Sequence, residues 1–147
     1  MDFYTGESRD GSRNTAQANP FVWNLKQDVM DNTNFFTLRW GGRHMQLGLM
    51  SIPVDTDTGL SIHQNIDHFF YIEQGNAIVF TGTDQRQLTL QAPVRDGSVI
   101  IVPARIWHNI VNVGYSSLKM FTIISPAYFS SNVTFENQGD WMPFQYL

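Results

Sequence analysis

The sequence predicts an all-β fold, a sandwich or a barrel, preceded by an irregular N-terminal arm. Three observations lead to this prediction. Short runs of β-branched and aromatic residues follow one another about 8–12 residues apart, which is the spacing of strands in such folds. Turn signals, most of them containing glycine, separate the runs, and no segment keeps a long 3.6-residue period.

The elements are expected in the following order. Residues 1–20 lack hydrophobic periodicity and are polar, which predicts an arm that becomes ordered only by docking on another surface. Residues 22–30 are a candidate for one short helix. The expected strands are 35–40, 44–53, 68–72, 77–81, 86–90, 98–102, 107–113 and 118–125. The tail after Ser130 is rich in Asn, Phe and Trp, and we expect irregular structure that packs back on the body.

Length and composition limit the classes of protein. A chain of 147 residues suffices for one domain with its own core, expected over 21–147 after the arm at 1–20. The lack of cysteine excludes disulfides, thiolate catalysis and cysteine zinc sites, and nine scattered Lys and Arg with net charge -4 argue against nucleic-acid binding. There is no apolar stretch of membrane-helix length and no signal-peptide pattern, so we expect a soluble, cytoplasmic protein.

Three of the four histidines stand where β-type runs begin or end: His63, His68 and His108. A straight strand would aim His63 and His68 at opposite faces, because they lie five positions apart. They can converge only if the chain bends between them, and residues 64–67 tolerate a bend. Convergent neutral imidazoles suit a transition metal, whereas histidine pairs in β-rich proteins are more often structural. Both interpretations stay open on spacing alone.

Two stretches resemble the motifs of the cupin superfamily. Residues 61–75 read SIHQNIDHFFYIEQG and keep the spacing of the first motif, H-x-H, four residues, E, six residues, G. Ser61 stands in place of the first histidine, and His68 in place of the glutamate. Residues 97–112 read GSVIIVPARIWHNIVN and match the second motif except that Arg105 replaces the glycine of P-x-G. The resemblance, closest to small cupins labelled mannose-6-phosphate-isomerase-like, implies a jelly-roll β-barrel (double-stranded β-helix).

The resemblance also implies a site. His63, His68 and His108 would hold one divalent transition metal, either Fe, Ni, Mn or Zn, with Ser61 as a weak ligand or a hydrogen-bonding neighbour. Asp67 would orient an imidazole or act as a base. The alternative is a cupin whose pocket no longer binds metal.

Alternation along the runs adds the surroundings of this site. Phe70, Ile72, Ile106 and Ile110 are expected on the ligand face, where they form either a pocket or plain barrel core. Arg105 either binds an anion at the barrel mouth or is solvated, and Gly75 and Gly97 are expected to serve turns of unusual φ.

Two function classes remain. One is a metal-dependent enzyme of oxygenase or isomerase type acting on a small anionic molecule. The other is a non-catalytic cupin, a ligand-binding or structural assembly protein. Tyr71 and Trp107 are expected to face outward and to contribute, with the arm, to a homodimer interface.

Overall fold

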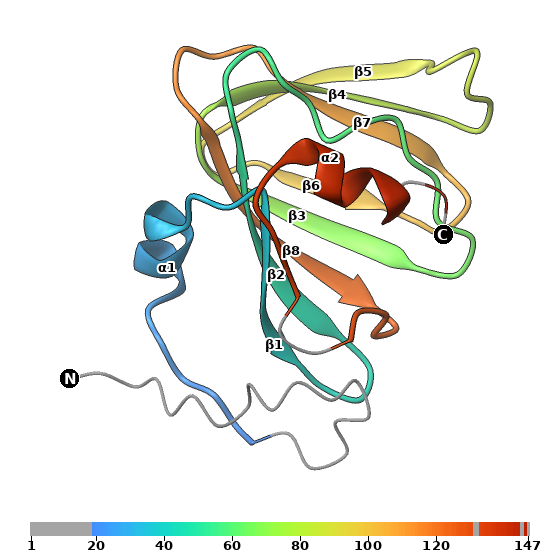
Figure 1. Ribbon diagram of the computed structural model, residues 1–147. Coiled ribbons are helices and arrows are strands. Elements are labelled where there is room, and N and C mark those ends of the chain that lie inside the picture. Colours follow the sequence, from blue (N-terminus) through green and yellow to red (C-terminus); the bar gives the residue numbers. More distant parts are fainter. Residues whose placement is uncertain (1–18, 131–132, 145, 147) are drawn as a thin grey trace.

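A computed structural model describes residues 19–130, 133–144 and 146 (Figure 1). The predicted arm at 1–20 therefore falls almost wholly outside the described residues. Within them the fold is the expected jelly-roll β-barrel, built from two facing antiparallel sheets. No helix in these ranges is long and apolar enough to cross a membrane.

The larger sheet has six strands in the order β6-β3-β8-β2-β1-β9, and the smaller sheet has the order β5-β4-β7. In chain order the strands are β1 (Phe36–Gly41), β2 (Gln46–Ile52), β3 (Asp67–Gln74), β4 (Asn76–Gly82), β5 (Leu90–Arg95), β6 (Val99–Val102), β7 (Trp107–Asn112), β8 (Leu118–Ser125) and β9 (Thr134–Phe135). An isolated bridge between Ser61 and His108 brings the segment before β3 alongside β7.

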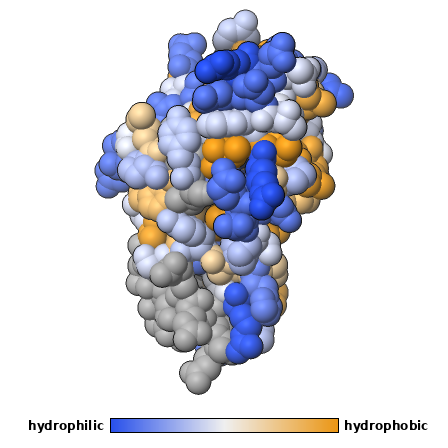
Figure 2. Space-filling model, turned by 90° about the vertical axis from the view of Figure 1, so that its right-hand side faces the viewer, coloured by the Kyte–Doolittle hydropathy of each residue, from blue (hydrophilic) through white to orange (hydrophobic). Residues whose placement is uncertain are grey.

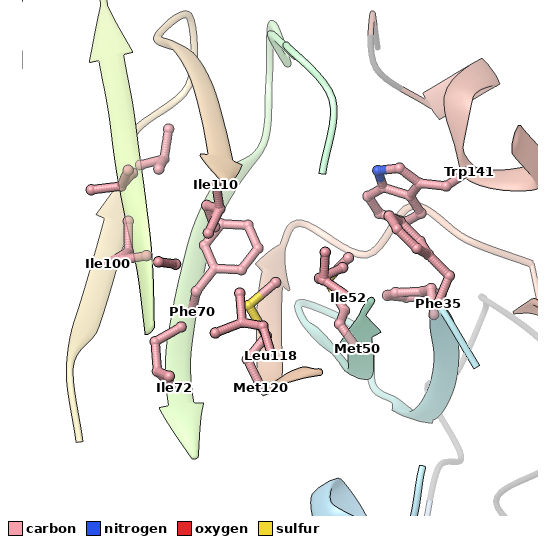
Figure 3. Packing of buried hydrophobic residues seen from close by; sticks show 14 of the residues in the cluster. Phe35, Met50, Ile52, Phe70, Ile72, Ile100, Ile110, Leu118, Met120 and Trp141 are labelled. Atoms are coloured by element: carbon pink, nitrogen blue, oxygen red, sulfur yellow. The ribbon is translucent and has the colours of Figure 1, made fainter. Parts of the chain in front are cut away.

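The core lies between the two sheets. Along β3, His68, Phe70 and Ile72 are buried while the residues between them are half-buried, which is the alternation of a strand with one face on the core. Figure 3 shows Phe70, Ile72, Ile100 and Ile110 at one end of the core, Met50, Ile52, Leu118 and Met120 in the middle, and Phe35 and Trp141 at the other end. The expected inward positions of Phe70, Ile72 and Ile110 are confirmed, and Ile106 packs against the same core.

The helix expected over 22–30 is α1 (Leu25–Asp31). It begins after Asn24, whose side chain accepts a hydrogen bond from the amide of Gln27. The helix lies on the outer face of the larger sheet (Figure 1), where Val29 of the helix and Leu49 of β2 are fully buried.

One expected strand is wrong. Residues 84–87 form a turn closed by a bridge between Asp84 and Gln87, and the strand in this region is β5, Leu90–Arg95, paired with β4 alone. Its inward residues are Ala92 and Val94, and Pro93 between them disguises the alternation. Proline has no amide hydrogen to donate, and it is tolerated here because β5 is an edge strand.

The tail packs back on the body as expected. After β9 it forms α2 (Gln138–Trp141) and η2 (Met142–Phe144), which lie between the two sheets (Figure 1). Trp141 is buried against Phe36 of the larger sheet and Phe35 just before it, and the side chain of Gln138 donates to Asp57 beside the smaller sheet. The tail thereby bridges the two sheets.

Candidate metal centre

The structure brings the three predicted histidines together. His68 is the second residue of β3, His108 is the second residue of β7, and His63 precedes the turn into β3. All three side chains are buried, and the rings of His63 and His68 stack with centroids 4.5 Å apart. The centroid of His108 lies 5.4 Å from that of His63 and 5.6 Å from that of His68.

The chain has the bend that the odd spacing of His63 and His68 requires. It bends at Gln64 and Asn65, so His63 turns back toward the side of β3 on which His68 lies. Two backbone hydrogen bonds of 2.9 Å pair Ser61 with His108, and this pairing places His108 next to His63. The amide of Arg105 donates to the carbonyl of His63 at 2.8 Å and holds this loop against the one before β7.

Hydrogen bonds fix which ring nitrogens are free. Nδ1 of His108 lies 3.0 Å from the carbonyl oxygen of Ile106, and Nε2 of His63 lies 2.8 Å from that of Phe144. A carbonyl oxygen only accepts, so both nitrogens carry the hydrogen. The lone pairs are therefore on Nε2 of His108 and on Nδ1 of His63.

The donor set fits a metal ion. One nitrogen from each histidine lies within 4.8 Å of the other two. Two imidazole nitrogens bound to one ion are at most about 4 Å apart, which is twice the usual metal–nitrogen bond length. The ligand nitrogens therefore need to approach one another by less than about 1 Å. Nδ1 of His63 and Nδ1 of His68 are buried with no hydrogen-bond partner among the described residues, a costly state that a cation or a water would relieve.

Burial keeps the three rings neutral near pH 7, the form that binds metal. Desolvation lowers the pKa of His63, which the bond to Phe144 partly offsets. Desolvation, then the charges of its two neighbours, lowers the pKa of His68 well below its usual value. Desolvation also lowers the pKa of His108 to about 4, against the raising effect of the Ile106 carbonyl.

The surroundings are apolar, and no carboxylate belongs to the group within the described residues. The ring of Phe70 lies 5.3 Å from that of His68 and 6.4 Å from that of His108. Asp67 is exposed and its carboxylate accepts from the amide of Ala104. Glu73 lies 3.9 Å from the ammonium of Lys26, at the outer side of β3.

Ser61 and Arg105 lie beside the histidines with other partners. The Ser61 hydroxyl is buried and donates to the carbonyl of Gly59 at 3.0 Å. Arg105 has φ +70°, so a left-handed position that usually takes glycine is kept with an arginine, whose side chain is exposed. Gly75 and Gly97 also have positive φ, as predicted for these turns.

Sequence reasoning missed Phe144. Its carbonyl oxygen binds His63, and the ring of Tyr146 meets that of Trp107 at 6.0 Å. The aromatic tail predicted packing on the body, but a backbone carbonyl belongs to every residue, and no side-chain pattern marks this one out.

Two facing sheets that enclose a buried histidine cluster define a small β-barrel protein with a candidate metal centre. The chain belongs to the cupins: the family model for a cupin domain, Cupin_2, matches residues 48–124, which include all three histidines.

The chain is similar to three proteins in particular. It is 40% identical over 121 residues to the uncharacterized protein YrkC of Bacillus subtilis (strain 168), covering 82% of this chain and 65% of YrkC. It is 32% identical over 108 residues to the uncharacterized protein L612 of Acanthamoeba polyphaga mimivirus, covering 73% and 66%. The crystal structure of BH2720 from Bacillus halodurans matches with a TM-score of 0.84 and 35% identity, over 86% of this chain and 96% of that one. The match thus spans just under two thirds of each of the two curated relatives.

Proposed function

We propose that this cupin binds one divalent transition metal, either Fe, Ni, Mn or Zn, through His63, His68 and His108. The observation that carries the proposal is the convergence of three buried, neutral imidazoles, two of which have an Nδ1 atom with no hydrogen-bond partner among the residues that the structure describes. Burying such nitrogens without a partner is unfavourable, so the cluster has a physical need for a ligand.

The donor set supports a chemical class. Three neutral imidazoles leave a divalent ion its whole positive charge, which favours an anionic ligand or a bound hydroxide. The apolar wall around Phe70 strengthens that attraction, because it lowers the local dielectric. We therefore propose a small anionic molecule as the ligand, with oxygenase- or isomerase-type chemistry supplied by the bound metal.

Metal content tests this proposal. The protein is purified without added metal and analysed by elemental mass spectrometry beside the variants His63→Ala, His108→Ala and His44→Ala. His44 is the matched control, because it is the fourth histidine and lies outside the cluster. We expect near one metal per chain in the wild type and in His44→Ala, and a loss of most of it in the other two, with folding checked by circular dichroism. A wild type without transition metal, even after incubation at micromolar concentrations, rejects the proposal.

The outer face of the larger sheet favours a second candidate function, which is self-association of the chain. Its register places apolar side chains in two adjacent rows across four strands. Ile101, Phe69, Ile123 and Leu47 form one row, and Val99, Tyr71 and Phe121 form the other, which ends at Leu49 where α1 covers the sheet. Ile101 and Val99, on the edge strand β6, are 67% and 47% exposed. We propose a second copy of the chain as the partner of this face, since two such apolar faces complement one another.

Trp107, also predicted for the interface, lies in the smaller sheet against Tyr146 and does not share this face with Tyr71. Analytical ultracentrifugation of Ile101→Lys and of Leu90→Lys tests the assembly. Leu90 is a comparable control because it is 54% exposed and lies on the other sheet. A dimer that dissociates only in Ile101→Lys supports the proposal, and a wild-type monomer at tens of micromolar contradicts it.

A further inference from the structure

The C-terminal segment contacts the immediate neighbours of two candidate ligands. We define the C-terminal strap as α2, η2 and Tyr146. The strap has an anchored part, which is built into the core, and a distal part, which reaches the histidines. The site proposed above uses no side chain of the strap.

The anchored part is held by aromatic packing and hydrogen bonds. Trp141 is 5% exposed and lies within 5.0–6.1 Å, centroid to centroid, of Phe35 and Phe36. Gln138 donates to the carbonyl and to the carboxylate of Asp57 at 2.8 and 2.9 Å. The ring of Phe144 meets those of Phe129 and Phe135, each at 5.0 Å. This end of the strap is therefore part of the folded core.

The distal part lies over the histidine cluster. The Phe144 carbonyl accepts from Nε2 of His63 at 2.8 Å, and Tyr146 pairs in parallel with Ile62, the residue before His63. The ring of Tyr146 contacts Trp107, the residue before His108. Tyr146 is 66% exposed, so less burial holds this part than holds Trp141. Figure 2 shows the side of the molecule on which Figure 1 places the C-terminus, with hydrophobic residues gathered in a band across its middle.

We infer that Phe144 is a positioning residue of the candidate metal centre. Its carbonyl holds His63 so that Nδ1 is the nitrogen offered to the ligand, and a metal ion on that nitrogen is held more tightly while the carbonyl is in place. The part of the inference that concerns metal rests on the proposed function, whereas the part that concerns the tautomer of His63 does not.

The physical argument is one of hydrogen-bond accounting. An imidazole in water exchanges its proton between Nδ1 and Nε2, but a carbonyl at hydrogen-bond distance accepts only and so fixes the proton on Nε2. Nδ1 is then the lone pair, and it is the His63 atom left without a partner in the described part of the chain. A fixed ring orientation of this kind raises the affinity of a metal ligand, and losing such a partner typically costs about 10–100-fold.

Two truncations isolate the carbonyl. A chain that stops after Pro143 loses the Phe144 carbonyl, whereas one that stops after Phe144 keeps an acceptor there and loses only the residues beyond it. Phe144→Leu keeps the backbone and most of the apolar volume. The tautomer is read in the metal-free protein near pH 7.5 by long-range ¹H–¹⁵N correlation of the imidazoles, with the His63 signals assigned by their loss in His63→Ala.

We expect His63 to carry its hydrogen on Nε2 in the full chain, in Phe144→Leu and in the chain ending at Phe144. In the chain ending at Pro143, a substantial Nδ1–H population should appear. A full chain with the hydrogen on Nδ1 overturns the inference by itself, so the test does not depend on the folding of a truncation. An unchanged tautomer in the chain ending at Pro143 overturns it as well.

The effect on metal binding is tested by loading the same proteins with Co²⁺ and timing its release to excess EDTA by absorbance. We expect release about 10-fold or more faster from the chain ending at Pro143, and within about 2-fold of the full chain for the one ending at Phe144. Equal release rates for all of them refute the effect on metal binding. If none of the proteins binds Co²⁺, the proposed function fails, while the tautomer of His63 still decides whether Phe144 positions it.

Discussion

The imidazole rings of His63 and His68 stack face to face, with centroids 4.5 Å apart and planes inclined by 30°. Both rings are buried, and the His108 ring stands across their edges. Positive charges held this close in an apolar interior repel strongly, so the arrangement is compatible with neutral rings and unfavourable for protonated ones. The stability of the metal-free protein should therefore depend on pH.

The sign of this dependence follows from the pKa shifts. The three folded-state pKa values lie below the usual 6.5, and that of His108 is about 4. At a pH between the folded-state pKa values and 6.5, the unfolded chain binds more protons than the folded one. The free energy of unfolding therefore falls as the pH drops below about 6.5. By pH 5 the loss from His108 alone is about 2 kcal/mol.

Urea unfolding of metal-free protein at pH 7.5, 6 and 5 measures this loss. His108→Leu should show a shallower pH dependence than the wild type, and His44→Ala should match the wild type. Equal stability of the wild type at pH 7.5 and pH 5 would show that the rings are not buried as described.

Arg105→Gly should stabilise the protein. Arg105 adopts φ +70°, where a side chain costs about 1–2 kcal/mol, and its own side chain is exposed. Glycine removes that strain but adds freedom to the unfolded chain, which leaves a net gain of about 0.5–1 kcal/mol in urea unfolding. Arg105→Ala removes the guanidinium and keeps the strain, so it should show no gain, and a gain of equal size in both variants would assign the effect to the charge.

Gly48→Ala should destabilise the barrel. A Cβ at Gly48 would lie 2.3 Å from a ring carbon of Phe36, which is 1% exposed and has little room to move. Overpacking of this kind costs about 1–3 kcal/mol. At Gly114 the nearest atom would be 3.4 Å away, so Gly114→Ala is the control and should change the midpoint of thermal unfolding far less. Equal midpoints for the two variants would mean that the Phe36 ring yields easily.

Much of the fold and the candidate site could be predicted from the sequence because side chains carry the signal. The alternation of large apolar residues along β3 and β7 indicates the inward face, and a histidine in that pattern is assigned with it. Gly75 and Gly97 mark turns because glycine adopts positive φ at little cost. The bend before His68 was required by the odd spacing of two histidines that have to meet.

What could not be predicted depends on backbone atoms and on long-range packing. Pro93 hides the alternation of β5, since its effect depends on whether the strand lies at an edge. The bond from His63 to Phe144 joins residues 81 positions apart through a carbonyl, which no residue type encodes. The partner of Asp67 could not be predicted either. Its position next to His68 in the sequence suggested a contact with an imidazole, whereas its carboxylate accepts a hydrogen bond from the backbone amide of Ala104.

The central claim is that His63, His68 and His108 together hold one divalent ion. Titration of the metal-free protein with Co²⁺, followed by visible d–d absorbance, tests it most directly. The claim predicts absorbance that saturates at one equivalent per chain and is lost in His68→Ala, with His44→Ala unchanged. No saturable absorbance in the wild type, or equal saturation in His68→Ala, would contradict it.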